Sequence, residues 1–309
     1  MNNNCNFENY QELLRPFKLI AFDWDGTAVE NRKTDAAIIT SKLEKLLKLG
    51  IYIVVISGTN INNIDSQFSS LIKGTYKKFL YICTNRGSEV FGFNEGSDLK
   101  LLYKRTASKQ EDMLLNKAAE KTKSAIENTS DAKIVIIYNR LNRRKIDLIP
   151  EWPDPPKSEI DRLLIMTEKR LDENGFAGGI KKAYNVLSNI AKTSGFTGAK
   201  ITSDVKHLEI GLTDKSDSIN WILLNLAEKY NIKDTEILIG GDEFGSIAGF
   251  EGSDSKMIIK KSIDITYFSV GIEPNGVPKN VIHITGGPAC FEKLIDEQIK
   301  IQLKKTEIR

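Results

Sequence analysis

The sequence predicts a doubly wound α/β core, with a Rossmann-like parallel sheet, that is interrupted by an inserted α+β domain. Short β-branched and apolar runs alternate with helix-period segments at the start of the chain, which is typical of a parallel sheet. This alternation stops near residue 95, and four of the eight prolines then fall within 150–158. It resumes near residue 215. We therefore predict a split core over 1–95 and 205–309, and an inserted domain over 96–204.

The first elements form a β-α-β unit. Residues 18–23 are an apolar run that ends in an acid, 36–50 have helical periodicity that a glycine ends, and 51–57 are a buried β-branched run. Such a unit implies parallel strands and a right-handed crossover. A helix near 61–72 and the run 79–84 add a third parallel strand.

The elements that follow do not continue the alternation of strand and helix. We predict a hairpin from 88–93 and 99–103, and a long amphipathic helix over 108–127. The remaining predicted elements are two strands within 133–149, helices over 157–173 and 181–194, strands over 199–204 and 207–212, a helix over 215–230, the strand 235–241 and a final helix after 286–288. We find no internal repeat.

Composition indicates a soluble globular protein, with 40% hydrophobic and 28% charged residues. Lys and Arg number 44 against 41 Asp and Glu, so no strong field suggests nucleic acid or an acidic membrane as partner. The first sixteen residues lack a signal-peptide pattern and no apolar run could span a bilayer, which favours a cytoplasmic protein. The oligomeric state is not indicated.

The histidines and cysteines do not suggest a metal cluster. Cys5, Cys83 and Cys290 have no paired spacing, and His207 and His283 are the only histidines. A zinc site and a histidine-dependent triad are therefore disfavoured, and we interpret His207 as structural. The chemistry is expected to use carboxylates, hydroxyls and lysines.

Acidic and polar residues follow several predicted strands. Asp23 and Asp25 end the first strand and Asp242 follows the late one, while Lys215 begins a helix. Because ligands bind at the carboxyl ends of parallel strands, these groups are expected to share one crevice. Hydroxyls and backbone N–H groups for phosphoryl oxygens follow the second strand, at Ser57, Gly58 and Thr59.

This set of groups is suited to phosphoryl transfer. Asp23 can act as nucleophile and Asp25 as proton donor to the leaving oxygen. Lys215 supplies positive charge where negative charge develops. Several carboxylates facing a phosphate would repel it, so a hard cation such as Mg²⁺ is expected.

Four motifs in order resemble those of the haloacid-dehalogenase-like (HAD) phosphohydrolases: 23-DWDGT-27, Ser57, Lys215 and 241-GD-242. The position of the insertion is similar to that in the subfamily with a large C2-type α+β cap. This subfamily includes Cof-type phosphatases, trehalose- and sucrose-phosphate phosphatases and eukaryotic phosphomannomutase. The resemblance implies a HAD-type core and a cap domain.

The resemblance also implies a role for each motif residue. Asp23 would form an aspartyl-phosphate, and Asp25 would act as general acid and then base. Asp23, the backbone carbonyl of Asp25 and the carboxylate of Asp242 would hold Mg²⁺, while Ser57 and Lys215 would bind the phosphoryl group. The chain departs from the commonest fourth motif, because Ser246 occupies the position of its second acid. Glu243 or Asp254 could substitute, and we favour Asp254.

Substrate contacts are less well specified by the sequence. Asn85 and Arg86 follow the third strand, and the resemblance places substrate-facing groups there, although a turn would use the same residues. The basic run 140-RLNRRK-145 offers Arg143 or Arg144 for the distal end of a substrate, or only an exposed strand face. Trp24 is either apolar packing or a substrate platform.

One short stretch points to another activity, because 240-GGDEF-244 matches the signature of diguanylate cyclases. Here it follows a buried strand instead of a hairpin tip, so we discard a cyclase and expect the two glycines to let the backbone turn.

We predict a Mg²⁺-dependent phosphatase acting on a small phosphorylated metabolite, most simply a sugar phosphate. The alternatives are a phosphosugar mutase and a non-catalytic phosphosugar-binding protein. A dehalogenase is disfavoured, because its chemistry does not need the second acid, Asp25.

Overall fold

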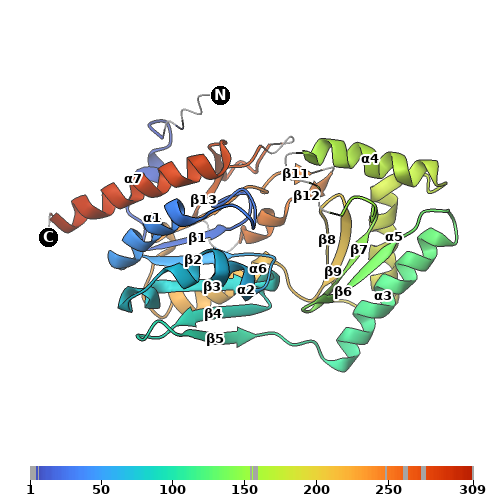
Figure 1. Cartoon of the computed structure of the whole chain (residues 1–309), viewed down its shortest axis with the longest axis horizontal. Coiled ribbons are helices and arrows are strands. Elements are labelled where there is room, and N and C mark those ends of the chain that lie inside the picture. Colours follow the sequence, from blue (N-terminus) through green and yellow to red (C-terminus); the bar gives the residue numbers. More distant parts are fainter. Residues whose placement is uncertain are drawn as a thin grey trace. The chain divides into compact units, whose positions relative to one another are not determined.

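The computed structural model divides into two compact units, which are described separately (Figure 1). The core unit comprises 1–104, 215–246 and 252–309, and the cap unit comprises 105–214 and 247–251. The residues that the structure describes are 5, 7–153, 155, 159–247, 249–259, 264–272 and 276–307. Within these ranges, no helix is both long enough and apolar enough to cross a membrane.

The core unit is built on an eight-stranded sheet in the order β14-β13-β10-β1-β2-β3-β4-β5 (Figure 1). The strands are β1 (Leu19–Asp23), β2 (Tyr52–Ile56), β3 (Leu80–Thr84), β4 (Glu89–Phe93), β5 (Leu99–Lys104), β10 (Ile237–Gly241), β13 (Thr266–Ser269) and β14 (Val281–His283). The strands from β14 to β3 are parallel, and β4 and β5 add an antiparallel hairpin. This confirms the predicted fold class.

Helices cover both faces of the core sheet, because alternate residues of its buried strands point to opposite sides. Ile20 and Phe22 pack with apolar residues of α1 (Ala37–Lys48), α2 (Ile61–Gln67) and α7 (Gly287–Glu307). Leu19 and Ala21 pack on the other face with α6 (Lys215–Ile222) and the π-helical turn that continues it to Ala227. The sheet is therefore covered on both faces, with α1 and α2 on one and α6 on the other, as in a doubly wound sheet.

The cap unit has a four-stranded antiparallel sheet in the order β6-β7-β9-β8. Its strands are β6 (Val135–Arg140), β7 (Arg143–Asp147), β8 (Lys200–Ser203) and β9 (His207–Gly211). Its helices are α3 (Lys109–Glu127), α4 (Ile160–Glu173) and α5 (Gly179–Thr193), and one apolar core joins these helices to the sheet. A short two-stranded ribbon of β11 (Ser246–Ile247) and β12 (Phe250–Glu251) lies later in the chain.

The limits of the cap unit differ from the predicted 96–204. Strand β5 pairs with β4 and so extends the core sheet to Lys104. At the other end, the cap unit continues past β9 to Asp214, and residues 247–251 also belong to it. The pairing of β5 with β4, and of β9 with β7 and β8, decides to which unit these strands belong, and pairing partners are not visible in sequence spacing.

Two helices of the cap share one type of ending. Helices α4 and α5 end in the same way, with Gly175 and Gly195 in left-handed conformation at φ 85° and 76°. In each case a buried phenylalanine follows, and its N–H donates to the carbonyl five residues earlier: Phe176 to Leu171 at 2.8 Å and Phe196 to Ala191 at 3.0 Å. These are two Schellman caps twenty residues apart.

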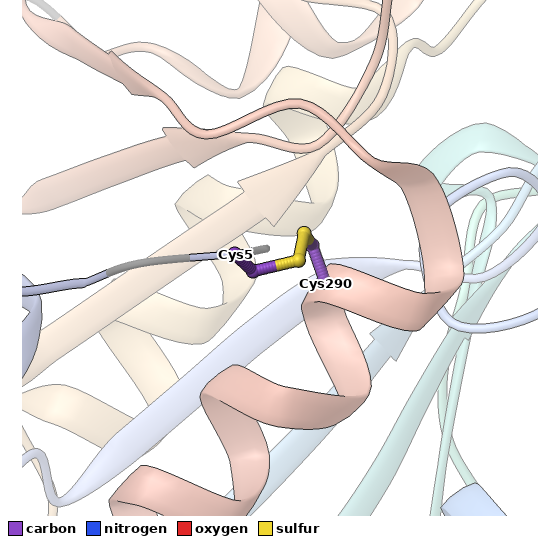
Figure 2. The surroundings of a disulfide bond; sticks show 2 residues. All are labelled: Cys5 and Cys290. Carbon is purple, nitrogen blue, oxygen red and sulfur yellow. A yellow bond between two sulfur atoms is a disulfide. The ribbon is translucent and has the colours of Figure 1, made fainter. Parts of the chain in front are cut away.

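A disulfide joins Cys5 to Cys290 at the start of α7 (Figure 2), with a Cα–Cα distance of 5.7 Å. The two cysteines are 285 residues apart, so their pairing depends on the fold and not on local spacing. Cys83 is buried in β3. Its burial raises the pKa of its thiol to about 12, although a hydrogen bond with Ser218 acts in the opposite direction. Cys83 is therefore a packed thiol and not a reactive thiolate.

Candidate active site

Three carboxylates meet at the carboxyl ends of neighbouring core strands. Asp23 ends β1, Asp242 follows β10, and Asp254 lies in the 3-10 turn η8 (Ser253–Met257). One carboxylate oxygen from each lies within 4.8 Å of the others. The parallel pairing of β1 with β10 brings the first two together, and Asp23 and Asp254 are buried. The grouping offers hard oxygen ligands, the kind that Mg²⁺ prefers.

Lys215, the first residue of α6, is buried against this group. Its Nζ donates to Asp23 Oδ1 at 2.8 Å and also to Asp254 Oδ1. Burial alone would lower the pKa of this ammonium, but the carboxylates of Asp23, Asp254 and Glu243 outweigh it and hold the pKa above 10.5. Lys215 therefore carries a fixed positive charge at physiological pH.

The two candidates for the second acid of the fourth motif have different surroundings. Asp254 is fully buried, and its Oδ2 accepts the backbone N–H groups of Asp242 at 2.9 Å and of Glu243 at 2.8 Å. Glu243 accepts a hydrogen bond from Ser253 Oγ at 2.8 Å. Among the described residues, the three-carboxylate group includes Asp254 and does not include Glu243. The arrangement favours Asp254, whose role as a metal ligand remains a prediction.

Glycines allow the close approach of these elements. Gly26 has φ 93°, and a side chain there would overlap the carboxylate of Asp242. The expectation that Gly240 and Gly241 serve a turn is wrong, because both lie in β10. A Cβ at Gly240 would meet the ring of Phe268, and one at Gly241 would meet Asp254. These two positions require space and not a special backbone conformation.

The loop after β2 contains the predicted phosphate-binding residues. The Ser57 N–H donates to the carbonyl of Cys83 at 2.9 Å, and Ser57 Oγ accepts the N–H of Thr59 at 3.2 Å. Thr59 Oγ1 accepts a hydrogen bond from Asn63 Nδ2 at 2.5 Å. Asn60, not Ser57 or Thr59, is the N-cap of α2. The loop is thus held at the strand end by its own hydrogen bonds.

The turn after β3 is strained and lies against this loop. Asn85 and Arg86 both have left-handed φ values, 51° and 55°, which cost about 1–3 kcal/mol each for non-glycine residues. The Asn85 N–H donates to Thr59 O at 2.8 Å, and the Arg86 N–H donates to Ser57 O at 3.2 Å. The side chain of Arg86 passes beside Gly58, where a Cβ would lie 3.8 Å from Arg86 Nε.

The segment after Asp23 has partners that the sequence does not reveal. Asp25 Oδ2 accepts a hydrogen bond from Arg32 Nε at 3.3 Å. Trp24 is fully buried, its ring packs 4.8 Å from that of Phe68, and its indole N–H donates to Gln67 Oε1 at 2.8 Å. Trp24 is therefore apolar packing and not a substrate platform. No sequence motif marks Arg32 or Gln67.

The two cap arginines have different partners, because adjacent residues of β7 point to opposite faces. Arg144 donates to Asn116 at 2.6 Å and to Asp112 at 2.5 Å, both on α3. Arg143 instead donates to Glu209 on β9 at 3.3 Å. Arg144 thus attaches a helix to the cap sheet and Arg143 pairs with a neighbouring strand, and the prediction that Arg143 or Arg144 contacts the substrate stays a prediction.

Comparisons with known proteins agree with this architecture. No protein-family model and no curated protein matches the chain. Among solved structures, IMP-bound Plasmodium falciparum IMP-nucleotidase has a TM-score of 0.58 and 12% identity, over 92% of this chain and 68% of that one. Aspergillus fumigatus trehalose-6-phosphate phosphatase has a TM-score of 0.55 and 15% identity, over 94% and 97% of the two chains. A trehalose-6-phosphate phosphatase related protein has a TM-score of 0.50 and 14% identity, over 93% and 99%.

These likenesses establish the class of fold. The chain has the HAD-type fold, with a Rossmann-like core and an inserted cap. The resemblance inferred from the four sequence motifs is confirmed at this level.

Proposed function

We propose that this protein is a Mg²⁺-dependent phosphatase that hydrolyses a small phosphorylated metabolite through an aspartyl-phosphate on Asp23. The observation that carries the proposal is the convergence of Asp23, Asp242 and Asp254 at the strand ends, beside the buried ammonium of Lys215. An apolar core would not bring three carboxylates this close without a partner, because their mutual repulsion costs stability.

The proposed chemistry uses two aspartates. A carboxylate oxygen of Asp23 attacks phosphorus, and the bond from phosphorus to the leaving oxygen breaks as Asp25 gives that oxygen a proton. Water then attacks the phosphorus of the aspartyl-phosphate and gives a proton to Asp25. Inorganic phosphate leaves and Asp23 is restored, so the net reaction is hydrolysis of one phosphate ester. Ser57 and Lys215 hold the phosphoryl oxygens.

The residues present fit a magnesium ion. Carboxylates of Asp23 and Asp242, together with the backbone carbonyl of Asp25, would hold it, and Asp254 would supply the second acid in preference to Glu243. Bound Mg²⁺ supplies the positive charge that lets these carboxylates face a phosphate. Asp254 also fixes the backbone after β10 through the two N–H groups that it accepts.

For the substrate we propose a sugar phosphate, in line with the structural likeness to trehalose-6-phosphate phosphatases. A nucleoside monophosphate is the second candidate, because IMP-nucleotidase is also similar over most of this chain. Asn85, Arg86 and Arg143 or Arg144 are the proposed substrate contacts. Arg86 is favoured among them because its strained turn lies on the loop of Ser57 and Gly58.

We also keep the prediction of a cytoplasmic location, which the disulfide makes testable. Reducing cytosol disfavours disulfides in most organisms. Alkylation of thiols during cell lysis would show whether Cys5 and Cys290 are reduced where the protein resides. A pair that is fully oxidised at lysis would contradict the prediction.

A phosphate-release screen tests the proposed function. It would compare sugar phosphates, nucleoside monophosphates and phosphoglycerates, each with Mg²⁺ or with a chelator, for the wild type and Asp23→Asn. We expect Mg²⁺-dependent release that the variant lacks. A catalytic amount of sugar bisphosphate would detect a mutase, through isomerisation without free phosphate. Release that persists in Asp23→Asn would rule out the proposed nucleophile.

A further inference from the structure

Gln67, at the last position of α2, uses both ends of its amide to hold the segment that follows Asp23. Its Oε1 accepts the indole N–H of Trp24 at 2.8 Å. Its Nε2 donates to the carbonyl of Asn31 at 3.1 Å and to that of Thr34 at 2.7 Å. One side chain thus contacts the chain on both sides of Asp25.

The two carbonyls belong to one closed turn. The Thr34 N–H donates to Asn31 O at 3.1 Å, and the Asn31 N–H donates to Thr34 Oγ1 at 3.3 Å. The Lys33 N–H also donates to Asn31 Oδ1 at 2.9 Å. Arg32 lies inside this turn, and its Nε donates to Asp25 Oδ2 at 3.3 Å. The position of Arg32, and through it one oxygen of Asp25, therefore depends on where the turn is held.

The other side of Asp25 is attached through Trp24. The carbonyl of Trp24 accepts the N–H groups of Ala28 at 3.0 Å and Val29 at 3.2 Å, which closes the backbone around Asp25. Because Trp24 is fully buried, its indole N–H requires a partner, and Gln67 provides it. The amide of Gln67 is therefore common to both attachments.

We propose that Gln67 is a positioning residue for the acid and base Asp25. It fixes Trp24 before Asp25 and the turn of Arg32 after it, so that the carboxyl of Asp25 stays in line with the leaving oxygen. The inference rests on the proposed phosphatase function. It assigns Gln67 no contact with substrate, and Arg32 transmits its effect to the carboxyl.

This role predicts a dependence on the leaving group. An alkyl or sugar phosphate needs a proton on its leaving oxygen, whereas p-nitrophenyl phosphate releases a stable anion. General acid catalysis is worth about 10²–10⁴-fold, and small misplacements lose part of it. Gln67→Met keeps length and removes the amide. We expect it to lower kcat/KM for an alkyl phosphate about tenfold or more, and for p-nitrophenyl phosphate less than about threefold.

The chain offers a matched control in Gln298 of α7. Its Nε2 also donates to two backbone carbonyls, Leu13 at 2.7 Å and Arg15 at 3.1 Å, and the residue is fully buried in the same unit. Gln298→Met removes a comparable pair of bonds away from Asp25. We expect any change in kcat/KM to be by the same factor for the alkyl phosphate and for p-nitrophenyl phosphate.

A second measurement does not depend on activity. Amide hydrogen exchange on the metal-free protein should be faster over 24–35 in Gln67→Met than in the wild type, and unchanged there in Gln298→Met. Arg32→Met should reproduce the leaving-group selectivity while the amide of Thr34, which lies in the turn, stays protected. Gln67→Met thus tests whether Gln67 holds the turn, and Arg32→Met tests whether Arg32 carries the effect of the turn to the carboxyl of Asp25.

Three outcomes would overturn the proposal. If Gln67→Met lowers kcat/KM equally for both substrates while the wild type is active, the positioning role is wrong and the phosphatase function still stands. Unchanged exchange over 24–35 would show that Gln67 does not hold the segment. A wild type that hydrolyses neither substrate with Mg²⁺ would overturn both the phosphatase and the positioning role.

Discussion

Buried charged groups occur in both units, but the carboxylates are spread among cations in one and converge on one point in the other. In the cap, Lys206 donates to both oxygens of Asp147 at 2.7 Å and to the carbonyl of Ile149 at 2.8 Å. On the same sheet, Glu209 lies 3.3 Å from Arg143 and 2.6 Å from Lys145. Each of these two carboxylates has a cation within ion-pair distance in the cap itself.

The core cluster is arranged differently. Three carboxylates, Asp23, Asp242 and Asp254, gather at one point, and Lys215 contacts two of them, Asp23 and Asp254. The proposed Mg²⁺ would stabilise carboxylates that lie this close together. The comparison teaches that the convergence of carboxylates on one point, more than burial or the number of ionisable groups, separates a candidate site from a structural network.

The largest expected difference between the clusters is catalytic. Asp23→Asn should lower phosphate release by about 10⁴-fold or more, because it removes the nucleophile. Asp147→Asn removes the same charge from the cap cluster and should leave kcat/KM near that of the wild type at a temperature where the variant is folded. Steady-state phosphate release from the two variants, side by side, measures the difference. Comparable losses of phosphate release in both variants would contradict the distinction between a catalytic core cluster and a structural cap cluster.

A second difference concerns stability. Lys206→Met leaves the buried carboxylate of Asp147 without its cation, so the free energy of unfolding should fall by about 3–5 kcal/mol. The double variant Lys206→Met/Asp147→Leu removes both charges and should recover much of that loss. Urea denaturation of the wild type, single and double variants checks this. If the double variant is no more stable than Lys206→Met, Lys206 and Asp147 are not a pair whose charges balance each other.

Metal-dependent stability should be confined to the core cluster. At a Mg²⁺ concentration 100 times its dissociation constant, binding to the folded state alone raises the free energy of unfolding by about 2.7 kcal/mol. Asp242→Asn should lose most of this increment, while Asp204→Asn, near Lys145 in the cap, should keep it. Thermal unfolding with and without Mg²⁺ gives the comparison. An undiminished increment in Asp242→Asn would exclude that residue as a ligand.

The smallest expected effect is the change with pH in the charge of Lys215 and in its contribution to stability. Its pKa is raised in the folded state, so its contribution to stability is complete below its unfolded value of 10.5. That contribution is lost only as pH rises through the higher folded value. Nitrogen-detected titration of the lysine side chains should show a charged Lys215 throughout pH 6 to 10, and a lower pKa in Asp23→Asn. Deprotonation of the wild-type group within that range would refute the assigned environment.

Much of the fold was predictable because it depends on local pattern. Alternating apolar runs and helical periods identified β1, β2, β3 and their helices, and the hairpin of β4 and β5 was also correct. Pairing decided what pattern could not. Strand β5 belongs to the core sheet because it pairs with β4, and the Schellman caps at Gly175 and Gly195 were missed although both glycines are visible in the sequence.

The candidate site divides in the same way. The sequence by itself determined which residues stand at the ends of core strands, because an apolar run and the polar residue and glycine next to it are close together in the sequence. Asp23, Ser57 and Asp242 are found in this way. Only the tertiary structure decided that Asp254 and not Glu243 joins Asp23 and Asp242, and that Trp24 packs against Phe68. It also brought Gln67 to the turn of Arg32, and Cys5 to Cys290. These contacts join residues far apart in the chain, and their distances are set by the packing of the sheet and helices, which no local pattern encodes.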